Sequence, residues 1–170
     1  MLVFAKPSAQ TFWMGLPLVV LGELIRIWSA GYLYKMEKLT TAGPFALCRN
    51  PLYVGSFFIS AGYFIMTGQP VVLIVGVILF WVFHGGAVAY EEGMLREKFG
   101  DEFVVYCKIV PRFVPRLRSL AGYGTFSLMQ IRQNHELRSL TATLIASGAF
   151  ALISYLPNLA PFRLLSNLGF

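Results

Sequence analysis

Long apolar runs dominate the pattern of hydrophobic and polar positions. Between residues 50 and 90 the chain has no Lys, Arg, Asp or Glu. A single polar break at residues 67–70, Thr-Gly-Gln-Pro, divides this stretch, and its Gly and Pro are typical of a tight turn. Each half is roughly 17 to 20 residues long, which is enough for a helix to cross the bilayer core. The pattern therefore predicts a membrane hairpin of two helices, at residues 51–67 and 70–90.

Two further apolar segments lie outside the hairpin. Residues 11–32 include Glu23 and Arg26, whose spacing places them on one face of a helix, and charges inside a membrane usually face the protein interior as a pair. Residues 139–156 form the last segment, which either spans the bilayer or lies as a re-entrant or interfacial helix. We therefore expect an all-α fold: a single integral membrane domain over residues 1–170, with about four transmembrane helices.

The composition and the placement of charge support a membrane protein. Only 13% of the residues are charged, against about 25% in soluble domains. The net charge of +6 could suggest nucleic-acid binding, but most basic residues lie in two connections, at residues 35–49 and 96–138. Basic connections favour the cytoplasmic side and contact with anionic lipid. The pattern predicts a multi-pass membrane protein with both connections in the cytoplasm and no nucleic-acid partner.

The common cofactor and metal motifs are absent from the sequence. There is no GxGxxG fingerprint and no GxxxxGK[ST] phosphate loop. The two histidines, His84 and His135, do not have metal-binding spacing, so no metal site is predicted.

The hairpin begins in a polar motif that suits ligand binding. Pro51 fits the first turn of a helix, and Asn50 then occupies the cap position that Asn favours. Helix N-termini attract carboxylates and phosphates, and Arg49 adds a bidentate donor. Tyr53 and Gly55 would offer an aromatic surface with room for a flat base. A capped helix with interfacial anchors is the alternative interpretation.

Two more polar blocks follow the hairpin. Glu91 and Glu92 stand at the expected cytoplasmic end of its second helix, where carboxylates oppose the helix dipole unless a bound cation or ribose compensates. Residues 90–106 contain helix formers that should extend this helix past the membrane, until Pro111 and Pro115 end it. Further along, Tyr106 and Arg112 could close a site, or could anchor an interfacial segment. Because a hairpin returns to the membrane face where it started, the sequence predicts that these blocks meet the Arg49 motif.

Taken in order, these blocks resemble the superfamily of isoprenylcysteine carboxyl methyltransferases and phospholipid methyltransferases. The resemblance covers residues 40–115, nearly half of the chain. The matching positions are Gly43, Pro44, Phe45, Arg49, Asn50, Pro51, Tyr53, Gly55, Glu91, Glu92, Leu95, Phe99, Gly100, Phe103, Tyr106 and Pro115.

The resemblance, which is to bacterial-type members, implies a bacterial inner-membrane protein with an S-adenosylmethionine pocket at the cytoplasmic face of a helical bundle. Carried over by position, the residues that would line it are Arg49, Asn50, Pro51, Tyr53, Gly55, Glu91 and Glu92, with Tyr106 as a further candidate. One departure matters: the family usually has His where this chain has Asn50. Asn keeps hydrogen bonding but does not change charge near neutral pH. Since methyl transfer from a sulfonium needs alignment more than proton chemistry, we expect Asn50 to substitute.

The resemblance favours a methyltransferase that acts on a carboxylate, amine or thiol of a lipid-like or prenylated acceptor. We hypothesise that Arg112 orients an anionic acceptor, with Arg132 or Glu136 assisting. A sterol-reductase-like NADPH enzyme is the closest rival, because that family also has an Arg-x-Pro-x-Tyr block. The acidic pair Glu91 and Glu92 suits the ammonium and sulfonium of S-adenosylmethionine better than the phosphates of NADPH. A non-catalytic membrane scaffold of the same fold is the third alternative.

Overall fold

The computed structural model describes residues 7–35, 37–116 and 124–156, and every regular element in these ranges is helical. The helices are α1 (Ala9–Tyr32), α2 (Pro44–Leu47), α3 (Pro51–Met66), α4 (Pro70–Ile109), α5 (Leu128–Gln133) and α6 (Glu136–Tyr155). The predicted all-α fold is confirmed.

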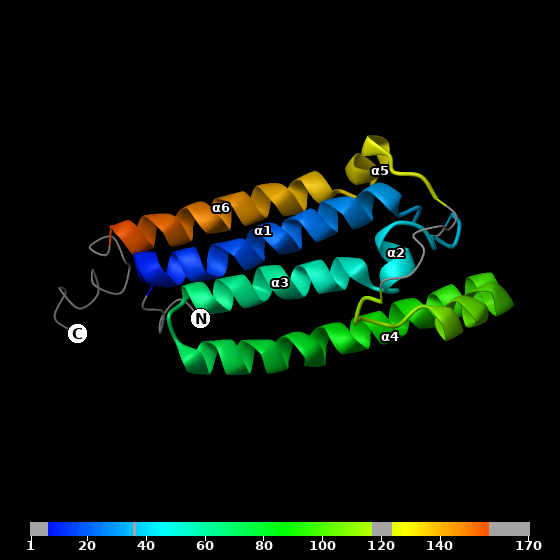
Figure 1. Ribbon diagram of the computed structural model, residues 1–170, viewed down its shortest axis with the longest axis horizontal. Helices are drawn as coiled ribbons and strands as arrows, with labels where there is room; N and C mark the ends of the chain where they lie inside the picture. The colour runs from blue at the N-terminus through cyan, green and yellow to red at the C-terminus, as the bar shows by residue number, and fades with distance from the viewer. Residues whose placement is uncertain (1–6, 36, 117–123, 157–170) are drawn as a thin grey trace.

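The four long helices lie side by side in the order α6, α1, α3, α4, with short α2 and α5 near one end (Figure 1). Among the described residues, α1, α4 and α6 are long and apolar enough to cross a membrane. Helix α3 is apolar but has only 16 residues, fewer than the roughly 20 that a spanning helix usually needs. Three of the about four expected transmembrane helices are therefore long enough to span, and α3 falls short by length.

Glycines let α1 and α3 approach very closely. The two antiparallel helices face each other at Gly15 with Gly62 and at Gly22 with Gly55, so each helix has a glycine every seventh position. A Cβ at Gly22 would lie 2.5 Å from the carbonyl oxygen of Gly55, and one at Gly62 would lie 2.7 Å from that of Gly15. Small residues at such positions are typical of helix contacts in membranes, where close packing replaces the hydrophobic effect.

The turn of the hairpin is where the sequence predicts it. Helix α3 ends at Met66, Gly68 takes a left-handed conformation with φ of 67°, and Pro70 begins α4. Pro at the first helical position has no lost hydrogen bond to replace.

Helix α4 continues beyond its expected membrane segment at residues 70–90, as the helix-forming residues at 90–106 predict. It reaches Ile109, interrupted by a non-helical Gly100 at φ 51° and ψ −125°. Glu91 and Glu92 thus lie inside a helix, and the expected conflict with a helix C-terminus at this point is wrong. The part of the chain after Gly100 packs against the connection that follows α1, where Phe103, Tyr106 and Val110 form a buried cluster with Leu39.

The two charges of α1 do not pair with each other as expected. Arg26 Nε and Nη2 donate to Glu136 of α6, at 2.7 and 2.9 Å, and Nη1 donates to Ser56 of α3 at 2.6 Å. Glu23 is buried, and neither of its carboxylate oxygens has a hydrogen-bond partner among the residues that the structure describes. Sharing one helix face does not bring Arg26 to Glu23, because α6 presents a better-placed carboxylate to the guanidinium.

Candidate active site

Arg49 joins the start of α3 to the middle and the end of α4. Its Nε lies 3.1 Å from Glu92 Oε1, and its Nη1 donates to the carbonyl oxygens of Cys107 at 3.1 Å and Val110 at 2.8 Å. The predicted meeting of the two polar motifs is confirmed. Much of the hydrogen-bonding capacity of Arg49 is used inside the protein.

Asn50 holds the same junction through its side-chain amide. It occupies the N-cap position of α3, as expected, but its side chain makes no capping bond. Instead Nδ2 donates to Glu92 Oε1 at 2.9 Å and to the carbonyl oxygen of Arg112 at 3.2 Å. Pro51 begins the helix and is buried. The Asn in place of the family's usual His therefore acts as a hydrogen-bond donor that positions Glu92.

Arg112 completes a three-residue centre with Arg49 and Glu92. Its Nε lies 3.1 Å from Glu92 Oε2, yet this buried nitrogen has no well-directed hydrogen bond. The side chain of Arg112 is 40% exposed, against 13% for Arg49. One carboxylate thus lies between two guanidinium groups, and the Arg112 side chain is the more exposed of the two.

Tyr53 and Glu91 form a second polar contact between α3 and α4. The phenol of Tyr53 donates to Glu91 Oε1 at 2.9 Å, and Glu91 is exposed. The Tyr53 ring meets the edge of His84 at 5.8 Å between centroids, and His84 stacks on Phe80 at 3.9 Å. Sequence reasoning missed His84 as a neighbour of the site. Its position seven residues before Glu91, on the same face of α4, was the available signal.

Two residues expected at the cofactor pocket have packing roles instead. A Cβ at Gly55 would meet Arg26 Cγ at 2.6 Å and the Gly22 carbonyl oxygen at 2.7 Å, so α1 occupies the space expected for a flat base. The Tyr106 phenol donates to the Phe45 carbonyl oxygen at 2.6 Å, and its burial raises the pKa of that phenol. Both positions were expected on the motif alone, which does not indicate which way a residue faces.

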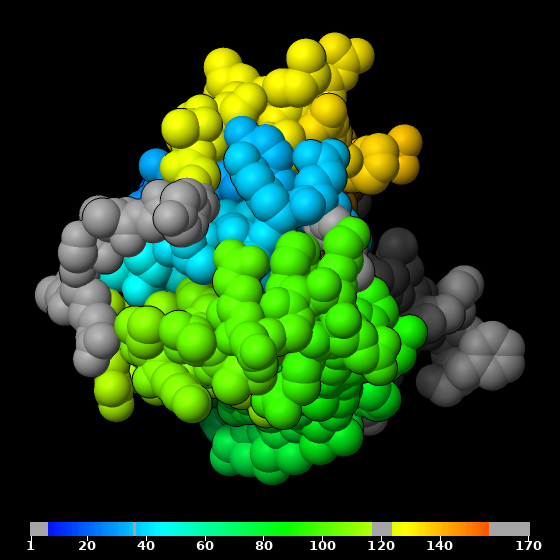
Figure 2. All heavy atoms as spheres, turned by 90° about the vertical axis from the view of Figure 1, so that its right-hand side faces the viewer, coloured from blue at the N-terminus to red at the C-terminus, as the bar shows by residue number. Residues whose placement is uncertain are grey.

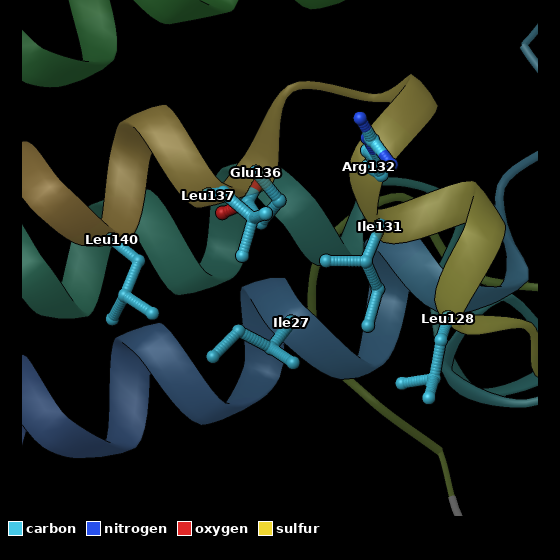
Figure 3. Close-up of a pocket in the computed structure, with 7 residues that line it drawn as sticks. All are labelled: Ile27, Leu128, Ile131, Arg132, Glu136, Leu137 and Leu140. Atoms are coloured by element: carbon cyan, nitrogen blue, oxygen red, sulfur yellow. The ribbon is translucent and has the colours of Figure 1, made fainter.

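Arg132 and Glu136 lie elsewhere. They line a cavity of about 400 Å³ between α1 and the α5–α6 segment (Figure 3). Helix α4 packs on α3, and α6 packs on the other side of α1. No contact among the described residues joins either side chain to Arg112. The expected assistance to Arg112 is therefore not supported, and Glu136 is bound to Arg26.

One end of the bundle gathers most of these groups. Figure 2 views this end, where α5, the residues after α1, α2 and the later part of α4 lie together. The described parts of both basic connections lie at the same end.

Comparison with known proteins identifies the family. Residues 10–102, more than half of the chain, match the family model of phospholipid methyltransferases. This chain belongs to the phospholipid methyltransferase family. The match includes the contacts of Arg49 and Asn50 with Glu92 and of Tyr53 with Glu91, whereas Arg112 lies beyond it.

Curated relatives extend the similarity of this family member. An Arabidopsis thaliana protein-S-isoprenylcysteine O-methyltransferase B is 33% identical over 67% of this chain and 66% of its own length. A nickel-cobalt-cadmium resistance protein of Alcaligenes xylosoxydans xylosoxydans is 30% identical over 70% of this chain and 56% of its own.

A solved structure agrees with the family assignment. The eukaryotic intramembrane Ras methyltransferase, an isoprenylcysteine carboxyl methyltransferase, matches with a TM-score of 0.55 and 31% identity over 62% of this chain and 42% of its own. The phospholipid methyltransferase family member described here thus spans about two fifths to two thirds of the length of these proteins.

Proposed function

We propose that this protein is an integral membrane methyltransferase that uses S-adenosylmethionine and acts on a lipophilic or prenylated acceptor at the cytoplasmic face. The observation that carries the proposal is the junction of the start of α3 with the middle of α4. There Arg49 and Asn50 bind Glu92, and Tyr53 binds Glu91. The same contacts fall within the family match, and relatives carry the name O-methyltransferase.

The chemistry of these groups fits the methyl donor. S-adenosylmethionine supplies a methyl group already activated on a sulfonium, and its amino-acid end carries an ammonium. The exposed carboxylate of Glu91 suits such a cation, because within the described part of the chain only its Oε1 is bound, to Tyr53. Glu92 is held between Arg49 and Arg112, so its role is to fix the walls of the site. Pro51 and Asn50 set the direction in which α3 begins.

Arg112 is the residue we assign to the acceptor. Its side chain is 40% exposed and lies on the segment that follows α4. A planar guanidinium fits a carboxylate in two parallel hydrogen bonds. In this proposal Arg112 orients an anionic acceptor toward the donor, and the protein holds both groups in line.

The alternatives receive less support. A reductase would bring the phosphates of NADPH toward the acidic Glu91, and the family and the relatives named above are not reductases. One relative is named for metal resistance. Within the described residues no group of three or more His, Cys, Asp or Glu could hold a metal ion, so this name adds no metal site here. A non-catalytic scaffold stays an outcome of the experiment.

Titration of the detergent-purified protein with S-adenosylhomocysteine tests the proposal, with NADPH in parallel. We expect binding of S-adenosylhomocysteine only, weakened about tenfold by Glu91→Gln, since a charged hydrogen bond contributes about 1.5–3 kcal/mol. Glu97→Gln is the matched control, because Glu97 is an exposed glutamate further along α4. Binding of NADPH alone would favour the reductase, and binding of neither compound would favour the scaffold.

A further inference from the structure

The cavity between α1 and the α5–α6 segment has an aliphatic wall. Five of its seven lining residues are Leu or Ile: Ile27 from α1, Leu128 and Ile131 from α5, and Leu137 and Leu140 from α6. Figure 3 shows Ile27, Ile131 and Leu140 extending into the space between the ribbons. Both long helices that bound the space are candidate membrane spans, so the cavity lies where lipid chains can reach it.

The two charged residues that line this cavity differ in whether their charge is paired. Its acidic residue, Glu136, has a side chain only 4% exposed and is bound by Arg26 through two hydrogen bonds. Its basic residue, Arg132, lies in the last turn of α5 and is exposed. The guanidinium of Arg132 has no ion pair or hydrogen bond to any residue that the structure describes. The rim of an apolar cavity thus carries one unneutralised cation.

We propose that this cavity binds an anionic lipid of the membrane, with an acyl chain along the aliphatic wall and its phosphate on Arg132. Chain and headgroup chemistry match two separate features of the site, because hydrocarbon suits the Leu and Ile wall and a phosphate suits a guanidinium fork. Arg132 belongs to the basic connection, and anionic lipids attract basic residues at a membrane surface. This lipid site is separate from the proposed methyltransferase site and does not depend on that function.

A bound lipid at this place would hold α5 and α6 against α1. The start of α5 and the residues next to α6 also contact the end of α1: the Ser127 amide donates to the Gly31 carbonyl oxygen, and Asn134 Nδ2 donates to those of Ala30 and Leu33. A ligand that binds only the folded state raises its stability in proportion to the logarithm of ligand concentration. Lipid binding therefore has a thermal readout that needs no methyl transfer.

The experiment compares phosphatidylglycerol with phosphatidylcholine of the same acyl chains, added to delipidated protein in detergent. Bound lipid is counted by native mass spectrometry, and the unfolding temperature is followed in parallel. We expect phosphatidylglycerol to be retained preferentially and Arg132→Ala to lower its affinity about tenfold. Arg138→Ala is the matched control, because Arg138 is exposed on α6 and does not line the cavity.

Further arms separate this proposal from simpler explanations. Leu140→Trp fills the apolar space and should lower retention of phosphatidylglycerol, whereas inorganic phosphate alone should give no thermal stabilisation. An equal loss in Arg138→Ala, or equal stabilisation by inorganic phosphate, would overturn the lipid site. If Leu140→Trp does not fold, Arg132→Ala, at an exposed position, still decides the question. Titration with S-adenosylhomocysteine should be unchanged in Arg132→Ala, so failure of either proposal is visible separately.

Discussion

Two arginine–glutamate centres of this protein use the same chemistry in different settings. Arg26 and Glu136 join α1 to α6 inside the bundle, and Ser56 of α3 occupies a third donor of the guanidinium. Arg49, Glu92 and Arg112 join α3 to α4 near the end of the bundle, beside the exposed pair of Tyr53 and Glu91.

The two centres differ in how many of their hydrogen-bonding groups already have partners within the protein. The Glu136 side chain is 4% exposed and its two oxygens are both bound, so this centre is complete without a ligand. At the second centre the Arg112 side chain is 40% exposed and its Nε lacks a directed hydrogen bond. A complete centre fixes helices, whereas an incomplete one at a helix junction can also bind.

The largest expected effect comes from breaking the buried centre. Arg26→Met leaves the Glu136 carboxylate buried without its partner, which costs about 3–5 kcal/mol of stability. The free energy of unfolding in mixed micelles measures the loss. The double variant Arg26→Met with Glu136→Leu should recover much of it, because it removes the unpaired charge. A double variant no more stable than the single one would show that lost packing of Arg26, not the stranded charge, causes the loss.

A substitution at the second centre should cost less folding stability than Arg26→Met but should weaken ligand binding more. Glu92→Gln removes the carboxylate that Arg49, Asn50 and Arg112 share, and we expect a loss of about 1–3 kcal/mol. The same variant should bind S-adenosylhomocysteine more weakly, whereas Arg26 variants that still fold should bind it normally. Unfolding and titration of one sample give both values, and normal binding by Glu92→Gln would contradict a role at the site.

A third glutamate, Glu23, sharpens the comparison because no described residue forms a hydrogen bond with its carboxylate. Glu23 is buried on α1 with both oxygens unsatisfied, so replacement by Leu should raise stability by about 1 kcal/mol or more. Thermal unfolding of Glu23→Leu beside wild type measures the change. A destabilised variant would indicate that the Glu23 carboxyl is protonated or binds an ion in the folded protein.

The smallest effect concerns two thiols next to the second centre. Burial raises the pKa of the Cys48 thiol to about 11, and it also raises that of Cys107, which is only partly buried. Because the thiolate is the reactive form, maleimide at pH 7–8 should label Cys107 and spare Cys48, whose labelling should increase as pH rises toward 11. Single-cysteine variants allow the rates to be compared. Equal rates at pH 7 would contradict the buried position of Cys48.

Much of the fold follows from local patterns that the sequence displays directly. The hairpin turn at residues 67–70 depends on a Gly that accepts positive φ and a Pro that starts a helix, and both act through their immediate neighbours. The meeting of Arg49 with Glu92 follows from the length of that hairpin. The continuation of α4 past Glu92 also follows from the local sequence, because the residues after 90 form helix readily although many of them are charged.

The family motif predicted the contacts of individual side chains less well than it predicted the fold. The resemblance placed Gly55 and Tyr106 at the cofactor, but Gly55 faces α1 and Tyr106 binds the Phe45 carbonyl oxygen. A position in a motif says that a residue is needed there and leaves open whether it contacts a ligand or a neighbouring helix.

By itself, then, the sequence determined the helical membrane class, the hairpin and the family, since these depend on apolar length, turn chemistry and ordered motifs. Only the tertiary structure decided which glutamate each arginine binds. Arg26 pairs with Glu136 and not with Glu23, which is three positions away on the same helix. Arg112 pairs with Glu92, whereas Arg132 and Glu136 line a separate cavity. Those choices depend on how helices distant in the sequence rotate and pack, and close contact between α1 and α3 through their glycines fixes that packing.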